Sequence, residues 1–244
     1  MKAALINEKP ALLLVGLPQH LKGFLKNQLA SDFELEFLAA EELSENLSLN
    51  NYYKIALFLS LNEPDDWQQK IAFLASGQKK LLIALPYLPG YRENQSHENQ
   101  DEFLLNWKKL LLKQQSWYKF LLQTFPLSQI LFFEGLSLST GMETIFSLPV
   151  LSLVDINKGL IYSTKLQNNH LSIIQQNEFL TTLVEYLEKP QQNRSVVIRS
   201  GDFAWGEFAS ELERLYQGYF QKNLISVFLD IELQSELPLT PAVR

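Results

Sequence analysis

The stretch that decides the fold is Ala11–Leu29, ALLLVGLPQHLKGFLKNQL. Its first five residues are all apolar, which is typical of a strand buried in a parallel sheet. Gly16 follows as a single turn glycine. Leu21, Leu25 and Leu29 then recur every fourth residue, as they would along one face of a helix. The order of strand, glycine turn and amphipathic helix predicts the first unit of a parallel α/β sheet.

The same stretch lacks most of the glycines with which such units bind a dinucleotide. A G-x-G-x-x-G pattern, or a close relative of it, lets the backbone approach a pyrophosphate and the helix pack closely on the strand. Gln19 and Lys22 occupy the two later positions, where their side chains would crowd the pyrophosphate. Gly16 could still seat a phosphate at the helix N-terminus, but a plain strand-to-helix turn is the favoured interpretation.

One acidic residue completes the set of candidate cofactor-binding residues, which is Gly16, Gln19 and Glu41. Glu41 lies near the offset at which a dinucleotide-binding fold places an acid on the ribose. Acidic residues are plentiful in this segment, so a solvated helix is the more ordinary interpretation of Glu41. We expect no bound cofactor, and NAD or NADP if there is one.

Length and composition predict an ordinary globular protein. The chain has 244 residues, of which 46% are hydrophobic and 20% charged, so it forms one large domain or one domain with a small appendage. The net charge of −6 argues against nucleic acid as a partner. The absence of cysteine excludes disulfides and thiolate chemistry and fits a reducing cytoplasm. No apolar run reaches the roughly 18 residues that span a bilayer, so we expect a cytoplasmic protein without a membrane span.

Apolar runs along the first half of the chain alternate with helical patterns. This alternation predicts an α/β fold with a Rossmann-like, doubly wound parallel sheet over residues 1–140. The polar segment Tyr87–Gln100 is expected to be a loop, and Asp101–Gln123 a long helix. The further expected strands are Phe33–Leu38, Lys54–Ser60, Lys80–Pro86 and Gln129–Phe133.

Beyond Gly135 the alternation loosens, which predicts a smaller, irregular α+β part over residues 141–244. A helix is expected after Asp202 as its N-terminal cap, with Trp205, Phe208, Leu212 and Leu215 along its apolar face. The other expected elements are strands at Ser147–Val154, Leu160–Ser163 and Ser195–Arg199 and a helix at Asn177–Glu188.

Four segments in this order resemble the extended short-chain dehydrogenase/reductases, the NAD-dependent epimerase/dehydratase group. GLPQHLKGFLKNQL lies over the family's glycine-rich opening, and QILFFEGLSLSTG is similar to its fifth strand and the segment after it. There Glu134 stands at a family arginine and Ser139-Thr140 at a Tyr-Gly pair. NEFLTTLVEYLEKP and VVIRSGDFAWGEFASELERL resemble two later helical segments, the second with Gly201, Trp205 and Phe208 in the expected neighbourhood.

The resemblance implies a catalytic Tyr-x-x-x-Lys pair on the long helix, which this sequence lacks. Such a tyrosine acts as an acid or base near neutral pH only if a nearby cation lowers its pKa. Tyr118 is followed at the required spacing by Leu122, and neither Tyr87 nor Tyr91 has a lysine four residues on. The segment ALPYLPG also lacks the serine or threonine that the family carries after its fourth strand. We therefore assign no catalytic residue.

Other polar groups receive ordinary interpretations. His20, His97 and His170 share no metal-ligand spacing, so no metal site is expected. The carboxylates between Glu93 and Glu102 could form a cation site, but solvation and a favourable helix-start charge explain them better. Lys108, Lys109 and Lys113 form a basic stripe that is typical of a solvated helix face.

Three functions from different classes remain open at this point. The leading one is a degenerate, non-catalytic member of the resembled group that serves as a structural or interaction subunit. The second is an active sugar-nucleotide or related NAD(P)-dependent enzyme with atypical residues. The third is a binding module that keeps a nucleotide or other small ligand without turnover. The long helix at 101–123 carries more apolar residues than one sheet face needs, which predicts either a dimer or partner interface or a deeper monomer core.

Overall fold

The computed structural model describes most of the chain. The described residues are 9–44, 47–61, 66–77, 81–93, 102–134, 136–137, 153–166, 168–188, 195–199 and 201–234.

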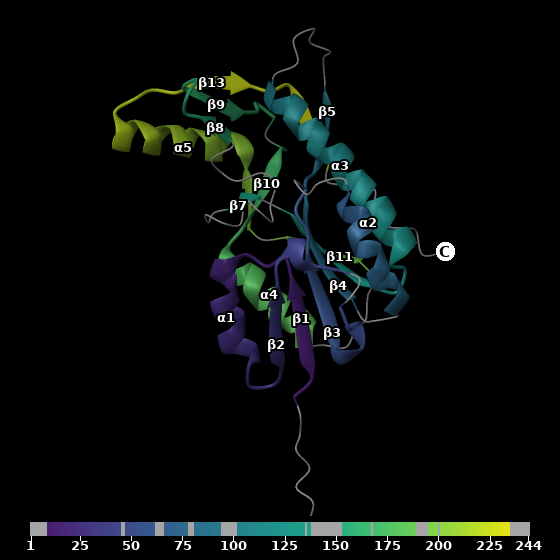
Figure 1. Ribbon diagram of the computed structural model, residues 1–244. Coiled ribbons are helices and arrows are strands. Elements are labelled where there is room, and N and C mark those ends of the chain that lie inside the picture. Colours follow the sequence, from purple (N-terminus) through teal and green to yellow (C-terminus); the bar gives the residue numbers. More distant parts are fainter. Residues whose placement is uncertain are drawn as a thin grey trace, which may run out of the picture.

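A six-stranded sheet forms the centre of the molecule (Figure 1). Its strands are β1 (Ala11–Val15), β2 (Glu34–Leu38), β3 (Lys54–Phe58), β4 (Leu81–Tyr87), β6 (Gln129–Glu134) and β11 (Ser195–Arg199). They lie in the order β11-β6-β4-β3-β1-β2, and every neighbouring pair is parallel. The chain steps from β1 to β2 in one direction and then crosses to β3 on the other side of β1. This doubly wound, Rossmann-like order confirms the predicted fold class.

Helices cover both faces of this sheet and divide the core into two layers. On one face lie α1 (Gln19–Leu29) and α4 (Gln176–Glu188), and on the other α2 (Trp67–Ala72) and α3 (Glu102–Thr124). Strand side chains alternate between the layers: Leu12 and Leu14 face α1 and α4, whereas Leu13 and Val15 face α2 and α3. Both faces are covered, so the strands read as continuous apolar runs.

The rest of the chain forms small sheets and one long helix above the carboxyl edge of the large sheet (Figure 1). One sheet has the order β12-β10-β7, a second β13-β9-β8, and a third pairs β14 with β5. The helix is α5 (Trp205–Phe220), and η1 (Ala40–Glu42), η2 (Leu49–Asn51) and η3 (Phe73–Gly77) are short 3-10 helices. The strands are β5 (Gly90–Glu93), β7 (Leu136–Ser137), β8 (Val154–Asp155), β9 (Leu160–Ser163), β10 (His170–Ile174), β12 (Gly201–Ala204), β13 (Ile225–Phe228) and β14 (Ile231–Gln234).

Two predictions about local structure are wrong. Part of the expected loop Tyr87–Gln100 is extended, because β5 pairs antiparallel with β14 from the far end of the chain. Asp202 does not cap the last helix: it lies in β12, and Ala204 precedes the first turn of α5. In both cases a partner strand distant in the sequence supplies the hydrogen bonds, which a local pattern does not reveal. The expected strand at 147–153 lies mostly outside the described residues.

The apolar residues of α3 lie largely inside the molecule. Trp107, Trp117 and Leu121 are almost completely buried against the sheet, whereas Leu105 and Leu112 are exposed. Much of the apolar excess in the predicted helix therefore contributes to a deeper core. β11 and α4, from the second half of the sequence, belong to the large sheet and its covering layer, and the domain boundary near residue 140 stays a prediction.

A buried lysine joins the start of β3 to the end of α4. The Lys54 side chain is almost fully buried, and its Nζ donates hydrogen bonds to the carbonyl oxygens of Tyr186 at 3.1 Å and Leu187 at 2.6 Å. The last carbonyls of a helix have no partners within the helix, and a cation there also complements the helix dipole. Lys54 therefore acts as a cap for α4 supplied by a distant strand.

Replacing this buried cap should destabilise the fold. We expect Lys54→Met to lower the free energy of unfolding by about 1–3 kcal/mol, because two buried carbonyl groups lose a charged donor. Urea denaturation followed by circular dichroism measures the change. Lys26→Met on the exposed side of α1 is the matched control and should stay within about 0.5 kcal/mol of the wild type. Equal effects of the two substitutions would contradict a capping role for Lys54.

Candidate functional site

The carboxyl ends of the parallel strands form the edge where ligands bind in open α/β sheets, at the point where strand order reverses. In this protein that point lies between β1 and β3, and Gly16 occupies it. Gly16 has a φ of +78°, and a Cβ placed on it would lie 2.6 Å from the carbonyl oxygen of Phe58 at the end of β3. Its amide donates to the carbonyl oxygen of Leu38 at the end of β2, at 3.0 Å. Gly16 thus holds three strand ends together.

The N-terminus of α1 offers few donors to a phosphate. Phosphate loops bind through several free backbone N–H groups. The Gly16 amide is bonded to Leu38, Pro18 has no N–H, and the Leu21 amide donates to the Pro18 carbonyl at 3.0 Å. Gln19 is exposed at the start of the helix, where the family pattern has a glycine. The loop therefore keeps one glycine of the pattern, and the amide of that glycine is used within the sheet.

Lys22 and the predicted cofactor residue Glu41 lie on either side of this loop. Lys22, at the third glycine position, places its Nζ 5.6 Å from the centroid of the Phe37 ring on β2. Glu41 is exposed on η1, and its neighbour Ala40 comes within 3.9 Å of a Cβ placed on Gly16. The structure therefore brings Gly16 and η1 together at one edge of the sheet. Binding of a cofactor by Gly16, Gln19 and Glu41 stays a prediction.

A second polar group lies farther along the same edge, where Tyr87, Glu134 and Arg199 end three adjacent strands in register. In-register residues project to the same face of a sheet, which here is the face covered by α2 and α3. The Arg199 Nε donates to the Glu134 Oε2 at 2.6 Å. Tyr87 and Glu134 are buried, whereas Arg199 is exposed.

Burial controls the protonation of this row. It raises the pKa of the Glu134 carboxyl, and the adjacent Arg199 guanidinium opposes that rise. Burial, and next the charge of Glu134, raise the pKa of Tyr87 to about 12. The Tyr87 hydroxyl therefore stays protonated near neutral pH, which suits a structural hydroxyl rather than an acid–base catalyst.

Asp202 and Ser172 extend the polar row into the small sheets. The Ser172 hydroxyl donates to the Asp202 Oδ1 at 2.6 Å, across the β10–β12 pair. The charge of Asp202 also contributes to the raised pKa of Glu134. Arg199 lines a cavity of about 410 Å³ between β11 and the first half of α4, together with Asn177, Glu178, Thr181 and Thr182.

α3 covers the site with a different set of side chains from a Tyr-x-x-x-Lys pair. Gln114 is buried and binds the backbone of Leu88 twice: its Oε1 accepts from the amide at 2.7 Å and its Nε2 donates to the carbonyl at 3.2 Å. Tyr118 packs edge-on against Phe132, and burial raises its pKa. This part of α3 therefore fixes the chain after β4.

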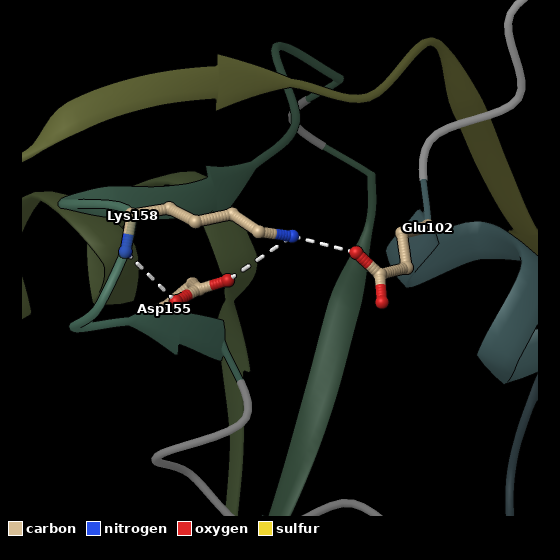
Figure 2. A network of polar contacts seen from close by, with 3 residues as sticks. All are labelled: Glu102, Asp155 and Lys158. Atoms are coloured by element: carbon tan, nitrogen blue, oxygen red, sulfur yellow. Dashed lines mark hydrogen bonds and ion pairs between the residues drawn. The ribbon is translucent and has the colours of Figure 1, made fainter.

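An exposed ion network links α3 to the β8–β9 turn (Figure 2). The Lys158 Nζ lies 2.6 Å from the Glu102 Oε2 and 3.5 Å from the Asp155 Oδ2. These three residues, with Phe103 and Tyr162 behind them, line a cavity of about 480 Å³. The network gives Glu102 a structural partner, while Glu98 and Asp101 lie outside the described residues. Exposed ion pairs of this kind contribute little to stability.

Among the residues that the structure describes, no group of three or more His, Cys, Asp or Glu side chains could hold a metal ion. No helix in the described ranges is long and apolar enough to cross a membrane. His97 lies outside them.

The sequence contained a signal for the Tyr87–Glu134–Arg199 row that local motif analysis missed. Each residue follows a buried apolar run at the point where a strand ends. The polar residues after Tyr87 favour a loop at that position, and the family pattern marks Glu134 only as the replacement of an arginine. Strand order and register, which the sequence did not supply, were needed to place the three residues side by side.

Comparison with known proteins supports the fold alone. No protein-family model matches the chain, and no curated protein sequence matches it. A dTDP-glucose 4,6-dehydratase from Bacillus anthracis, solved with NAD, is 9% identical with a TM-score of 0.52 over 90% of this chain and 84% of that one. A dTDP-4-dehydrorhamnose reductase from the same organism, solved with NADP, is 11% identical with a TM-score of 0.52 over 91% and 85%.

A further dTDP-4-dehydrorhamnose reductase, from Clostridium acetobutylicum, is 11% identical with a TM-score of 0.52 over 89% of this chain and 83% of that one. The fold therefore resembles that of the extended short-chain dehydrogenase/reductases, as the four sequence segments predicted. At these identities the likeness extends to the fold and not to the chemistry.

The contact at Gly16 should make this position intolerant of any side chain. We expect Gly16→Ala to lower the free energy of unfolding by at least about 3 kcal/mol. The φ of Gly16 is positive, and the Phe58 carbonyl occupies the space of the added Cβ. Gly23→Ala in α1, where a Cβ meets nothing within 4 Å, should instead stabilise by about 0.5–1 kcal/mol. Thermal and urea unfolding of both variants tests the difference. A harmless Gly16→Ala would refute the strand-junction role.

The Glu134–Arg199 pair should give a pH-dependent effect. The folded state raises the pKa of Glu134, so the contribution of Glu134 to stability falls as pH rises through that pKa. We expect Arg199→Met to cost about 1 kcal/mol near neutral pH, less than a fully buried pair because solvent screens Arg199. The cost should shrink as pH falls through the pKa of Glu134, which lies above the ordinary value for a glutamate, because the carboxyl then binds a proton.

Glu134→Gln is the matched control for this prediction. In the Glu134→Gln background, Arg199→Met should lose its pH dependence, because no carboxylate remains to be left unpaired. Urea unfolding of the four variants at several pH values completes the cycle. A cost that is the same at every pH would show that Arg199 acts through packing alone.

Proposed function

We propose that this protein is a non-catalytic relative of the NAD-dependent epimerases and dehydratases that serves as a structural or interaction subunit. The observation that carries the proposal is the state of the tyrosines near the carboxyl edge of the sheet. Burial raises the pKa of Tyr87, Tyr91 and Tyr118. A tyrosine acting as acid or base near neutral pH needs the opposite shift, from a cation placed beside it.

The phosphate loop supports the same proposal through a different contact. The Gly16 amide and the space above Gly16 are both used to join strand ends. A dinucleotide pyrophosphate would have to replace contacts that hold β1, β2 and β3 together. We therefore propose that the Rossmann-like sheet is kept for its shape and not for hydride transfer.

An interaction role needs a surface that can be covered. The outer face of α3 exposes Leu105 and Leu112, with Lys108 and Lys109 between them in the sequence. The long helix therefore stays a candidate surface for a partner or a second copy. This surface is small, since the larger side chains of α3 are buried in the core.

A second candidate function is binding of a small polar ligand without turnover. The cavity of about 410 Å³ between α4 and β11 favours it, since Asn177, Thr181 and Thr182 of α4 supply amide and hydroxyl groups to its wall. Asn177→Ala together with Thr181→Val should abolish any ligand-induced thermal shift that arises there. A thermal shift with a ligand other than NAD(H) or NADP(H) would not indicate dinucleotide binding.

Titration with dinucleotides tests the leading proposal. We expect the purified chain to show neither a fluorescence change nor a rise in melting temperature with NAD, NADH, NADP or NADPH, because the Gly16 amide is bonded to Leu38 and Gln19 and Lys22 stand at the other two glycine positions. The dTDP-4-dehydrorhamnose reductase solved with NADP is the positive control under the same conditions.

Two outcomes would overturn the proposal. Saturable micromolar binding of any of the four dinucleotides would show that the cofactor site is retained. Turnover of a nucleotide sugar with a stoichiometric change in NAD(P)H absorbance would establish the alternative of an active enzyme with atypical residues. Absence of both, with a stable partner in solution, is the expected result.

A further inference from the structure

We infer that β13 and the C-terminal half of α5 form the contact surface for a second copy of this chain, with the two β13 strands paired antiparallel about Val227. This inference rests on the proposed function, because the second copy would be the partner that the interaction role requires. The surface itself is separate from the carboxyl end of β1, where the candidate cofactor site lies (Figure 1).

Large apolar side chains are exposed on β13 and on the last turns of α5. Tyr219, Phe220, Ile225 and Phe228 are 82%, 62%, 67% and 54% exposed, and Leu215 is also exposed. Side chains alternate between the two faces of a strand, so Ile225 lies on one face of the β13-β9-β8 sheet and Phe228 on the other. A second strand paired along the open edge of β13 would cover part of both faces, which explains these exposed residues better than contact with solvent.

β13 is also an edge strand that lacks the usual protection. It is the outer strand of the sheet β13-β9-β8, and its only partner strand among the described residues is β9 (Figure 1). Natural sheet edges avoid pairing through lysine, proline or a bulge within the strand. The sequence of β13, Ile-Ser-Val-Phe, contains no charged residue and no proline. The edge is therefore suited to pairing with another strand.

The alternation of backbone hydrogen-bonding groups along β13 selects the register of that pairing. The amides of Ile225 and Leu229 donate to β9, to the carbonyl oxygens of Gly159 and Ser163, both at 2.8 Å. Alternate residues of a strand direct their backbone groups to opposite edges, so Ser226 and Phe228 present theirs to the open edge. An antiparallel copy satisfies both residues when Ser226 pairs with the partner subunit's Phe228. Val227 then lies on the twofold axis.

Charge favours a second copy in this antiparallel orientation. Lys222 lies before β13, whereas Asp230 and Glu232 follow it, and all three are exposed. Antiparallel pairing brings the basic flank of each strand to the acidic flank of the other, and parallel pairing would bring like charges together. Lys165 is held over the Phe228 ring, with its Nζ 4.8 Å from the centroid.

The resulting contact is closed. A twofold pairing uses the same patch on both subunits, so it ends at the dimer and leaves no edge for further growth. Two three-stranded sheets would join into one six-stranded sheet, with an α5 helix from each copy beside it. The Ser226 hydroxyl lies 3.5 Å from Glu213 of α5, which ties the helix to the strand at the centre of the interface.

Measurement of the mass in solution tests the inference with the full chain. Sedimentation velocity and light scattering at tens of micromolar should give twice the 28.1 kDa of one chain. Ile225→Lys with Phe228→Lys should weaken the dimer by about a hundredfold or more, because four lysines would meet at one edge. Both side chains are exposed, so circular dichroism should show an unchanged monomer fold. Leu112→Lys, on the exposed face of α3, is the control and should leave the dimer intact.

Two further variants test the register. Lys222→Glu should weaken the dimer on the order of tenfold. Adding Glu232→Lys, at the position that faces residue 222 when Val227 lies on the axis, should restore most of the loss. The chain has no cysteine, so Val227→Cys should form a disulfide-linked dimer under mild oxidation, whereas Leu112→Cys should not.

A monomer at tens of micromolar would overturn the inference. So would a dimer that survives the double lysine variant, or one that cross-links through Leu112→Cys and not through Val227→Cys. Dinucleotide binding would overturn the proposed function and leave this result unaffected, so the two can fail separately.

Discussion

The close approach of Gly16 to the carbonyl of Phe58 is the constraint on which the rest of the sheet depends. Because Gly16 has a left-handed backbone at the end of β1, it can lie against the Phe58 carbonyl of β3 while its amide bonds to Leu38 at the end of β2. Strand order reverses at these three strands. The helices on both faces pack against strands whose spacing this junction fixes. A side chain at this position would separate the strands or distort the turn. The glycine is therefore required for the fold, whatever the protein binds.

The same contact separates the shape of the fold from its usual chemistry. In a dinucleotide-binding protein, a glycine turn leaves its backbone open to a phosphate. Here the turn faces inward to the neighbouring strands, and Pro18, which has no N–H, precedes the helix that follows. A similar replacement occurs on α3, where Gln114 binds the backbone after β4 and the nearby tyrosines have raised pKa values. Polar groups at the carboxyl edge of this sheet serve mainly to hold its parts together.

Groups that bridge distant parts of the chain repeat this theme. Lys54 caps a helix more than a hundred residues away, and Arg199 pairs with Glu134 across two strands. Lys54 begins the apolar run of β3, and Arg199 ends that of β11. Burial alone would disfavour such a charge, and the partner offsets that cost. The β13 edge is the exception, since its apolar side chains Ile225 and Phe228 are exposed in the described part of the chain. In the dimer that we infer, a second copy covers them.

Local patterns were sufficient to predict the central sheet. Apolar runs at β1, β3, β4 and β6, the leucine repeat of α1 and the long α3 are all visible in the sequence, because strand and helix periodicities arise from neighbours in the chain. The same holds for the missing glycines and the missing Tyr-x-x-x-Lys pair, which are absences at known spacings. The segments β5, β10, β13 and β14 escaped prediction, because each is short and draws its hydrogen bonds from a distant strand.

By itself, therefore, the sequence determined the α/β class, the buried strands, the helix faces and the erosion of a cofactor motif. Only the tertiary structure decided that Asp202 belongs to a strand, that Tyr87, Glu134 and Arg199 form one row, and that β13 lies at an open edge. Periodicity reports which face of an element is buried. Register and strand order report which residues meet, and these are set by contacts between segments that the chain brings together only on folding.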